Sequence, residues 1–432
     1  MTRPTVGFAG LTHLGLVSSI AAAAQGFAVI GYDADTTRVR GIVAGKLPVV
    51  EPGLDELAHV HGARLRITDR SAELAACDIV YIATDVPTDD RGQSDLKGIA
   101  ELIERVTPVL GPAALLVVLC QVPPGFTRAL AFPKARLFYQ VETLVFGRAV
   151  ERALKPERFI VGMADPAAAL PPSLAAFLGA FGCPILPMRY ESAELAKISI
   201  NCCLVASVTV ANTLAELSER VGADWSEIAP ALKLDRRIGA YSYLAPGLGI
   251  AGGNLERDLA TVLRIAGETG AEASLIEAFL RNSRHRRDWA LHALHDAVLA
   301  RKPDAAIGVL GLAYKENTHS TKNSPSLALI EALAPWRVKV FDPVVPASAA
   351  AGGHVAGAAS AYEAARDADA LAIMTPWPEF RALDPARLAR VMAGRVLLDP
   401  FRVLDEAAAK AAGLDYLTLG APPASTGALT HA

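Results

Sequence analysis

The stretch Val6-Gly7-Phe8-Ala9-Gly10-Leu11-Thr12-His13-Leu14-Gly15 decides the fold of this 432-residue chain. It predicts a strand over residues 5–10, a glycine turn and a helix over 14–24, with Thr12 in the place of the middle glycine of a GxGxxG pattern. In such a turn the first glycine bends the chain, the second admits a pyrophosphate and the third packs the helix on the strand. The N–H groups of the helix N-terminus also favour phosphate.

The next expected strand, residues 27–33, ends on Asp33. An acid at this place suits the adenosine ribose of NAD and repels the additional phosphate of NADP. We therefore predict NAD as the cofactor, with contacts at a set of positions in this region: Gly10, Thr12, His13, Leu14, Gly15 and Asp33. A tight strand-to-helix turn without cofactor is the alternative, because Thr12 adds a side chain where the pattern needs none.

Strand and helix patterns alternate along the first part of the chain. Strands are expected over 5–10, 27–33, 78–84, 115–122 and 158–162, and helices over 14–24, 36–44, 96–110 and 166–181. The same alternation restarts near Ala305, with strands over 306–312, 338–342, 370–375 and 396–399. Such alternation is typical of parallel sheets that are covered on both faces.

The openings of the two halves are alike, since Ile307-Gly308-Val309-Leu310-Gly311-Leu312 repeats the pattern of Val6 to Leu11. We predict an α/β fold of two Rossmann-like, doubly wound parallel-sheet domains joined by a central helical segment. The expected domains are an NAD-binding domain over 1–188, a helical connector over 189–300 that also dimerises, a nucleotide-sugar-binding α/β domain over 301–418 and a flexible tail over 419–432. Ligands are expected in the cleft at the carboxyl ends of the strands.

Composition excludes several classes of partner. The chain is 52% hydrophobic and 20% charged with a net charge of -3, and no stripe of Lys and Arg suggests nucleic acid or an anionic membrane. The N-terminus has no signal-peptide layout and the apolar runs are short or interrupted, so we expect a cytoplasmic protein without a transmembrane helix. The five cysteines form no metal-ligand spacing, so we expect reduced thiols and no metal site.

A second glycine loop, residues 247–258 (GLGIAGGNLERD), follows an expected helix over 191–221 that carries Lys197 and Asn201 four residues apart. Together they resemble the nucleotide-sugar 6-dehydrogenases, the UDP-glucose and GDP-mannose dehydrogenase family. In that family the loop reads GxGxGGSCFxKD, and its cysteine holds the acyl group as a thioester during the second of two oxidations by hydride transfer. Asn254 stands at that place here.

Other motifs extend the resemblance over about residues 5 to 405. They are GxxPxxEPGL at 45–54, Pro87-Thr88-Asp89 with Asp95-Leu96, VPPG at 122–125, Glu142 and Leu144 of NPEFL, ELAK at 194–197, RRIG at 236–239, GLAYK at 311–315, Ser324-Pro325 and TPWPEF at 375–380. Three of these motifs differ from the family pattern: Val86 replaces a threonine that contacts the cofactor, Cys120-Gln121 replaces Ser-Thr, and Gln140-Val141 replaces Asn-Pro.

The resemblance implies roles for individual residues. Lys197 would stabilise an oxyanion that Asn201 orients, Asp258 would hold the water that takes the hydroxyl proton, and Glu142 would act as a general base. A nucleotide-sugar, UDP- or GDP-linked, would contact Glu142, Lys197, Asn201, Arg237, Gly252 and Lys315, with Arg237 reaching into a neighbouring subunit. Further cofactor contacts fall on Val86, Gln121 and Lys322, and Asn254 occupies the catalytic position of the thiol.

Each role has a structural alternative. Lys197 and Asn201 could be solvent-facing residues of a long helix, and Asp258 could cap the helix that follows. Glu142 could be a surface carboxylate, and Arg237 and Lys315 could be solvated. Cys120 lies on the same loop as Gln121, but no neighbouring His lowers its pKa, so we expect no nucleophile there.

Three functions remain open from the sequence. The first is an NAD-dependent oxidoreductase that makes a single hydride transfer, as oxidation or reduction, because Asn254 cannot form a thioester. The second is a catalytically silent binding protein or scaffold, favoured by Thr12, Val86 and the altered segment around Glu142. The third is full oxidation to the sugar acid through a hydrated aldehyde activated by Glu142. A homodimer built on residues 190–300 is expected, because their apolar faces exceed what one helix buries.

Overall fold

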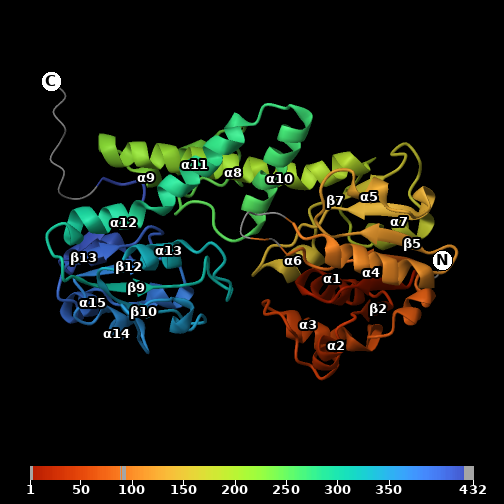
Figure 1. The fold of residues 1–432 in the computed structure, drawn as a ribbon, viewed down its shortest axis with the longest axis horizontal. Coiled ribbons are helices and arrows are strands. Elements are labelled where there is room, and N and C mark those ends of the chain that lie inside the picture. Colours follow the sequence, from red (N-terminus) through yellow and green to blue (C-terminus); the bar gives the residue numbers. More distant parts are fainter. Residues whose placement is uncertain (1–2, 88, 90–93, 423–432) are drawn as a thin grey trace. The chain divides into compact units, whose positions relative to one another are not determined.

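A computed structural model describes residues 3–87, 89 and 94–422 of the chain. The chain divides into two compact units, Met1–Ile200 and Asn201–Ala432 (Figure 1). Each unit contains one sheet with helices around it, and α8 (Tyr190–Val221) contributes residues to both units. The predicted pair of Rossmann-like parallel sheets with a central helical segment is confirmed.

The first unit is built on an eight-stranded sheet with the order β3-β2-β1-β4-β5-β6-β7-β8. The strands are β1 (Val6–Ala9), β2 (Val29–Tyr32), β3 (Leu65–Thr68), β4 (Ile79–Ile82), β5 (Leu115–Val118), β6 (Leu137–Gln140), β7 (Phe159–Met163) and β8 (Ile185–Arg189). The first six follow the order of a dinucleotide-binding domain. The chain reverses direction once, because β6 pairs antiparallel with β7 through Tyr139 with Gly162 and Gln140 with Val161.

Helices cover both faces of this sheet. They are α1 (His13–Ala24), α2 (Thr36–Val43), α3 (Leu54–His61), α4 (Lys97–Val106), α5 (Phe126–Ala129), α6 (Ala149–Leu154) and α7 (Pro172–Gly179). Ten of the twelve residues of α1 are buried, which explains why this helix is rich in alanine and small residues rather than amphipathic. On one face of the sheet, Phe177 packs edge-on against Phe27 with ring centroids 5.0 Å apart.

The second unit has a six-stranded sheet with the order β11-β10-β9-β12-β13-β14, and all its pairs are parallel. The strands are β9 (Ala306–Leu310), β10 (Arg337–Phe341), β11 (Val355–Gly357), β12 (Ala370–Ile373), β13 (Val396–Leu398) and β14 (Asp415–Leu417). Its helices are α9 (Trp225–Leu234), α10 (Asn254–Thr269), α11 (Ser274–Arg287), α12 (Trp289–Leu294), α13 (Pro325–Ala332), α14 (Ala361–Ala365), α15 (Pro385–Val391) and α16 (Glu406–Ala411).

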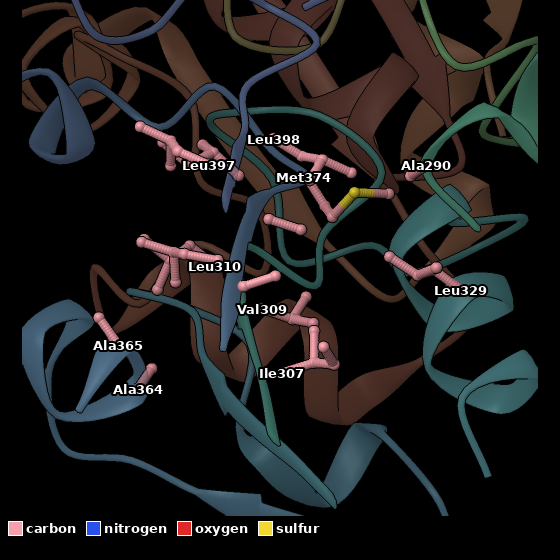
Figure 2. Close-up of a cluster of buried hydrophobic side chains, with 14 of the residues drawn as sticks. Ala290, Ile307, Val309, Leu310, Leu329, Ala364, Ala365, Met374, Leu397 and Leu398 are labelled. Atoms are coloured by element: carbon pink, nitrogen blue, oxygen red, sulfur yellow. The ribbon is translucent and has the colours of Figure 1, made fainter. Parts of the chain in front are cut away.

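The side chains of β9 alternate between two layers of this unit. Figure 2 shows Ile307 and Val309 directed toward Leu329 of α13, while Leu310 is directed toward Ala365 of α14. All five of these residues are at most 4% exposed. A strand that is buried on both faces must be apolar throughout, which is why the pattern of this half can be recognised in the sequence.

Several predicted elements differ from the structure. The strands β3, β6, β8, β11 and β14 were not predicted, and the helix expected over 166–181 spans only Pro172–Gly179, because Pro171 and Pro172 fix its start. The predicted tail also begins too early. Leu419 is 2% exposed and the Gly420 amide donates to Glu219 at 2.8 Å. Residues 423–432 of that tail lie outside the described residues.

The 32-residue helix α8 is the one helix of the described chain that is long and apolar enough to cross a membrane by length and composition. This corrects the expectation that every apolar run is too short or interrupted. Core helices of globular proteins satisfy the same criteria, and α8 carries Glu194, Asn201 and Asn212, all buried. Glu194 and Asn212 accept backbone amides and Asn201 donates to a carboxylate, so these polar groups are satisfied within the protein.

Candidate active site

The turn after β1 has the close contacts that make its outer two glycines necessary. Gly10 has φ +92°, and a Cβ there would lie 2.8 Å from Thr84 Cβ. A Cβ on Gly15 would lie 1.7 Å from the carbonyl oxygen of Gly10. Thr12 is accommodated because its hydroxyl accepts the Asp85 amide at 2.8 Å. The backbone therefore makes the tight strand-to-helix turn that the sequence predicts, with Gly10, Thr12, His13, Leu14 and Gly15 at the start of α1; their contact with the cofactor stays a prediction.

Asp33 lies beside this turn, at the end of β2. Its carboxylate accepts the Leu11 amide at 2.7 Å and the Asp35 amide at 2.9 Å, and it pairs with Arg38 at 2.7 Å. The side chain is 7% exposed. The structure thus brings Asp33 to the glycine turn, where the sequence interpretation places the ribose of NAD.

Glu142 and Lys197 form an ion pair in the first unit. Glu142 follows β6, and its Oε2 lies 3.2 Å from Nζ of Lys197 on α8. Their side chains are 17% and 12% exposed, so the pair is largely shielded from solvent, and Glu142 Oε1 also accepts the Leu144 amide. A pocket of about 60 Å³ adjoins residues 140–144, which is room for a few water molecules.

Glu194 holds the loop from Cys120 to Gly125, a role that the sequence did not predict. The buried Glu194 carboxylate accepts the Gly125 amide at 2.6 Å and the Thr127 amide at 2.8 Å, and burial raises its pKa. This anchors the segment that presents Gln121 to the helix that carries Lys197. The Glu of the ELAK motif, three residues before Lys197, is the sequence signal for this contact.

Cys120 has the properties of an inert core thiol. It is fully buried, its Sγ donates to the Ile82 carbonyl at 3.2 Å, and burial raises its pKa to about 12. Because the thiolate is the nucleophilic form, Cys120 carries no reactive sulfur near neutral pH. Val86 packs against the same buried cluster of side chains. Its burial and raised pKa support the expectation that Cys120 is not a nucleophile, which stays a prediction.

In the second unit, Asn201 and Asp258 meet. The Asn201 side-chain amide donates to Asp258 Oδ2, and Arg257 Nε lies 3.4 Å from Asp258 Oδ1. Asp258 is 1% exposed, and it lies in the first turns of α10. A buried carboxylate at this place is favoured by the positive end of the helix dipole and by the guanidinium beside it.

The second glycine loop is fixed to the segment before α13. The Gly252 amide donates to the Lys322 carbonyl at 3.0 Å, and the Asn323 side chain donates to the Gly252 carbonyl at 3.0 Å. Gly252 has φ +80°, and a Cβ there would lie 3.0 Å from the Tyr314 ring. Asn254 is the first residue of α10 and is exposed within its unit. The loop therefore holds Asn254 in a fixed backbone with its side chain accessible.

Two predicted contacts of the nucleotide-sugar lie elsewhere in this unit. Lys315 Nζ lies 5.8 Å from the centre of the Tyr314 ring. The Arg237 side chain is 89% exposed and pairs with Asp235 at 2.6 Å, which lowers the pKa of Asp235. The described residues hold no group of three or more His, Cys, Asp or Glu side chains that could bind a metal ion.

A larger pocket of about 270 Å³ lies in the second unit. Its walls include Trp225, Leu244, Pro246, Phe401 and Leu419, with Lys233 and Arg402 among its polar residues. Residues 400–402 and 419 come directly after β13 and β14, so the pocket lies at the carboxyl edge of the second sheet. Ligands of open α/β sheets bind at this edge.

Three family models match the chain. They describe the UDP-glucose/GDP-mannose dehydrogenase family: its NAD binding domain matches residues 4–176, its central domain 191–284 and its UDP binding domain 308–406. The predicted domain boundaries at 188/189 and 300/301 fall between these matches and stay predictions.

Proteins with similar sequences include UDP-glucose 6-dehydrogenase TuaD from Bacillus subtilis, which is 30% identical over 96% of this chain and 92% of its own length. UDP-glucose 6-dehydrogenase from Pseudomonas aeruginosa is 29% identical over 96% and 97%. Among solved structures, a UDP-glucose dehydrogenase from Pyrobaculum islandicum is 28% identical with a TM-score of 0.85, covering 98% of both chains. A UDP-D-ManNAc dehydrogenase from Pyrococcus horikoshii is 25% identical with a TM-score of 0.82, covering 96% of this chain and 99% of the other.

Proposed function

Because this chain belongs to the UDP-glucose/GDP-mannose dehydrogenase family, we propose that it transfers a single hydride between NAD and a UDP-linked sugar. The family consists of NAD-dependent oxidoreductases that act on CH–OH groups of nucleotide-sugars, and the cofactor of this chain is NAD. The observation that carries the finer proposal is Asn254, which opens α10 where the family motif has its cysteine.

The chemistry of one hydride transfer needs no covalent intermediate. When bound, NAD accepts or supplies the hydride. In the oxidative direction the substrate hydroxyl gives its proton to a water molecule that Asp258 holds. Asn201 donates a hydrogen bond to Asp258 and so fixes the position of its carboxylate. The Lys197 ammonium stabilises negative charge on the substrate oxygen, and Glu142 keeps that ammonium in place at 3.2 Å.

A second oxidation requires a nucleophile in addition to these groups. An aldehyde surrenders a hydride only after a nucleophile has made its carbon tetrahedral, and in this family that nucleophile is a thiolate. A carboxamide nitrogen has no basic lone pair, so Asn254 cannot replace it. Cys120 is buried with a pKa raised to about 12, so it supplies no substitute. The proposed product is an aldehyde or keto sugar nucleotide.

We assign the nucleoside of the UDP-sugar to the 270 Å³ pocket beside β13 and β14. The UDP binding domain model ends at residue 406 and includes Pro400, Phe401 and Arg402 of its wall. Flat apolar walls suit a pyrimidine ring, and a lysine at the rim suits a phosphate. Lys315 and Gly252 belong to the loops that we assign to the remaining diphosphate and sugar contacts.

A homodimer in the cytoplasm completes the proposal. The part of α8 in the second unit exposes Val210, Leu217 and Val221 by 53%, 52% and 63%, which is more apolar surface than an unpartnered helix usually presents. Arg237, exposed by 89%, is available for the neighbouring subunit. A monomer in light scattering at working concentrations contradicts this assembly.

One observation favours a second candidate, full oxidation by water. The small pocket beside residues 140–144 can hold water next to Glu142, a carboxylate able to act as base on a hydrated aldehyde. A panel of UDP- and GDP-sugars tested for NADH formation and for thermal shift separates the candidates. One NADH for each UDP-sugar supports the proposal, whereas two NADH for each sugar indicate full oxidation. Thermal shift without NADH formation in either direction indicates a silent binding protein instead.

A further inference from the structure

The first residue of α1 is tied to the loop that carries Glu142 through one buried carboxylate. His13 Nε2 lies 2.8 Å from Glu51 Oε1, and the Glu51 side chain is fully buried. Both Glu51 oxygens accept the Gly147 amide at 2.9 Å, and Oε2 accepts the Ala149 amide at 3.2 Å. Because Glu51 acts toward these amides as an acceptor, the His13 nitrogen that faces it is a donor.

A ring contact reinforces this tie. The rings of His13 and Phe146 are stacked with centroids 4.1 Å apart. Residues 141–148 connect β6 to α6. His13 contacts the far end of this loop directly at Phe146, and Glu51 links it to the amides of Gly147 and Ala149. The near end of the same loop carries Glu142, which is paired with Lys197. One side chain at the cofactor turn thus fixes the loop on which a proposed active-site carboxylate is placed.

We propose that His13 and Glu51 are positioning residues that couple NAD binding to the order of the Glu142 loop. The proposal rests on the proposed function, since it takes the turn at Gly10–Gly15 as the cofactor site. A ligand that fixes the start of α1 also fixes the His13 ring. The loop of residues 141–148 can then open only by breaking its contacts with a ring that no longer moves with it. By linkage, a loop that is held closed strengthens NAD binding by the same factor.

Hydrogen exchange of the Gly147 and Ala149 amides, measured with and without saturating NAD, tests the coupling. In the wild-type chain NAD should slow exchange of both amides by about fivefold or more, the lower end of usual coupling between sites. In His13→Ala NAD should bind more weakly by the linkage factor, and the slowing should disappear even at an NAD concentration that saturates this variant. His13→Gln, which keeps a donor, should recover part of both effects. Glu151→Gln is the matched control, since Glu151 lies on α6 directly after the loop and its side chain is 60% exposed, and it should respond like the wild type.

Phe146→Leu provides a second variant that does not disturb the glycine turn, because Phe146 is 40% exposed. It should weaken the NAD-dependent slowing without abolishing it. Binding of NAD by calorimetry without protection of these amides overturns the coupling alone, and so does a His13→Ala chain that responds like the wild type. A complete lack of NAD binding in calorimetry overturns the proposed function as well.

Discussion

The two sheets begin with the same turn but continue differently. Gly10 and Gly311 both have φ +92°. In each half an aspartate at the end of the second strand accepts the amide that follows the glycine, at 2.7 Å for Asp33 and 2.6 Å for Asp342. This shared contact closes the strand-to-loop turn in both halves, so it is a feature of the fold and not by itself a mark of a cofactor.

The difference lies in where the next helix begins. In the first half α1 begins at His13, directly after the glycine turn, so its N-terminal N–H groups can meet a pyrophosphate. In the second half residues 311–324 form a long loop and α13 begins at Pro325, which has no N–H group. That loop carries Lys315 and Lys322 instead. Under the proposed function, the first half therefore binds phosphate through backbone N–H groups, and the second half binds it through side-chain cations.

The two aspartates also differ in what they can still accept. The Asp33 carboxylate, which has about four lone-pair sites, accepts three donors: the amides of Leu11 and Asp35 and the guanidinium of Arg38. Asp342 accepts from the amides of Leu312, Ala313, Val344 and Val345 and from the indole of Trp377. Asp342 is saturated by the protein, while Asp33 retains capacity for a ribose hydroxyl.

The largest effect is expected from Gly15→Ala. A Cβ would lie 1.7 Å from the Gly10 carbonyl and 2.6 Å from that of Ala83, and neither backbone group can move without displacing β1 or β4. We expect a loss of more than about 3 kcal/mol of stability, beyond ordinary overpacking, together with loss of NAD binding. Gly179→Ala is the control, since nothing lies within 4 Å of its Cβ. Equal melting temperatures for the two variants contradict this account of the turn.

Lys315→Ala tests the second half, where side chains replace the helix end. Loss of one charged contact to a diphosphate costs about 1.5–3 kcal/mol, so UDP affinity should fall roughly 10- to 100-fold. NAD affinity should not change. Titration calorimetry with UDP and with NAD measures both, and Lys410→Ala, on the surface of α16 beside Glu406, is the control. An unchanged UDP affinity would contradict the assignment of the diphosphate to Lys315.

The pair Asp33→Asn and Asp342→Asn compares the aspartates directly. Asp33→Asn removes the charge that repels the additional phosphate of NADP, so the preference for NAD over NADP should fall by about tenfold, or 1.4 kcal/mol. Asp342→Asn should destabilise the second unit and leave the cofactor preference as it is. Binding of both dinucleotides is measured by protein fluorescence. A shift of preference in Asp342→Asn would remove the functional distinction between the two halves.

The smallest effect is expected from Thr12→Gly. The missing side chain lets the backbone approach the pyrophosphate, but the variant also loses the hydroxyl that accepts the Asp85 amide. NAD affinity should therefore rise only by about two- to threefold, which is less than 1 kcal/mol. Thr12→Val, which keeps the size without the hydroxyl, should weaken binding. Weaker binding in Thr12→Gly as well would show that the hydroxyl contact matters more than space.

The fold could be predicted where strands are buried on both faces, as β9 and β4 are, because their apolar runs have no other explanation. The edge strands β3 and β8 escaped prediction since Arg66, Leu186 and Pro187 leave them half exposed and without a continuous apolar run. The antiparallel pair of β6 and β7 depends on packing that a local pattern does not encode.

In the candidate site, too, a local sequence pattern predicts some residues, whereas contacts between distant segments are not predicted. Lys197 and Asn201 could be chosen from their helical spacing together with the family resemblance, and Asp33 from its place after a strand. The contacts of Glu51 and Glu194 could not be predicted, because each joins segments at least 38 residues apart along the chain. Buried carboxylates inside recognisable motifs, EPGL and ELAK, were the available signal for them.

The stoichiometry of the reaction tests the central claim most directly. With excess NAD and a UDP-sugar substrate, NADH and sugar nucleotide are counted after complete turnover, and the product is identified by mass spectrometry. Because Asn254 cannot form a thioester, we predict one NADH for each sugar and a product that has lost two hydrogens, and Asn254→Cys should gain some acid formation. Two NADH for each sugar, with the mass of the sugar acid from the wild-type chain, would contradict the account.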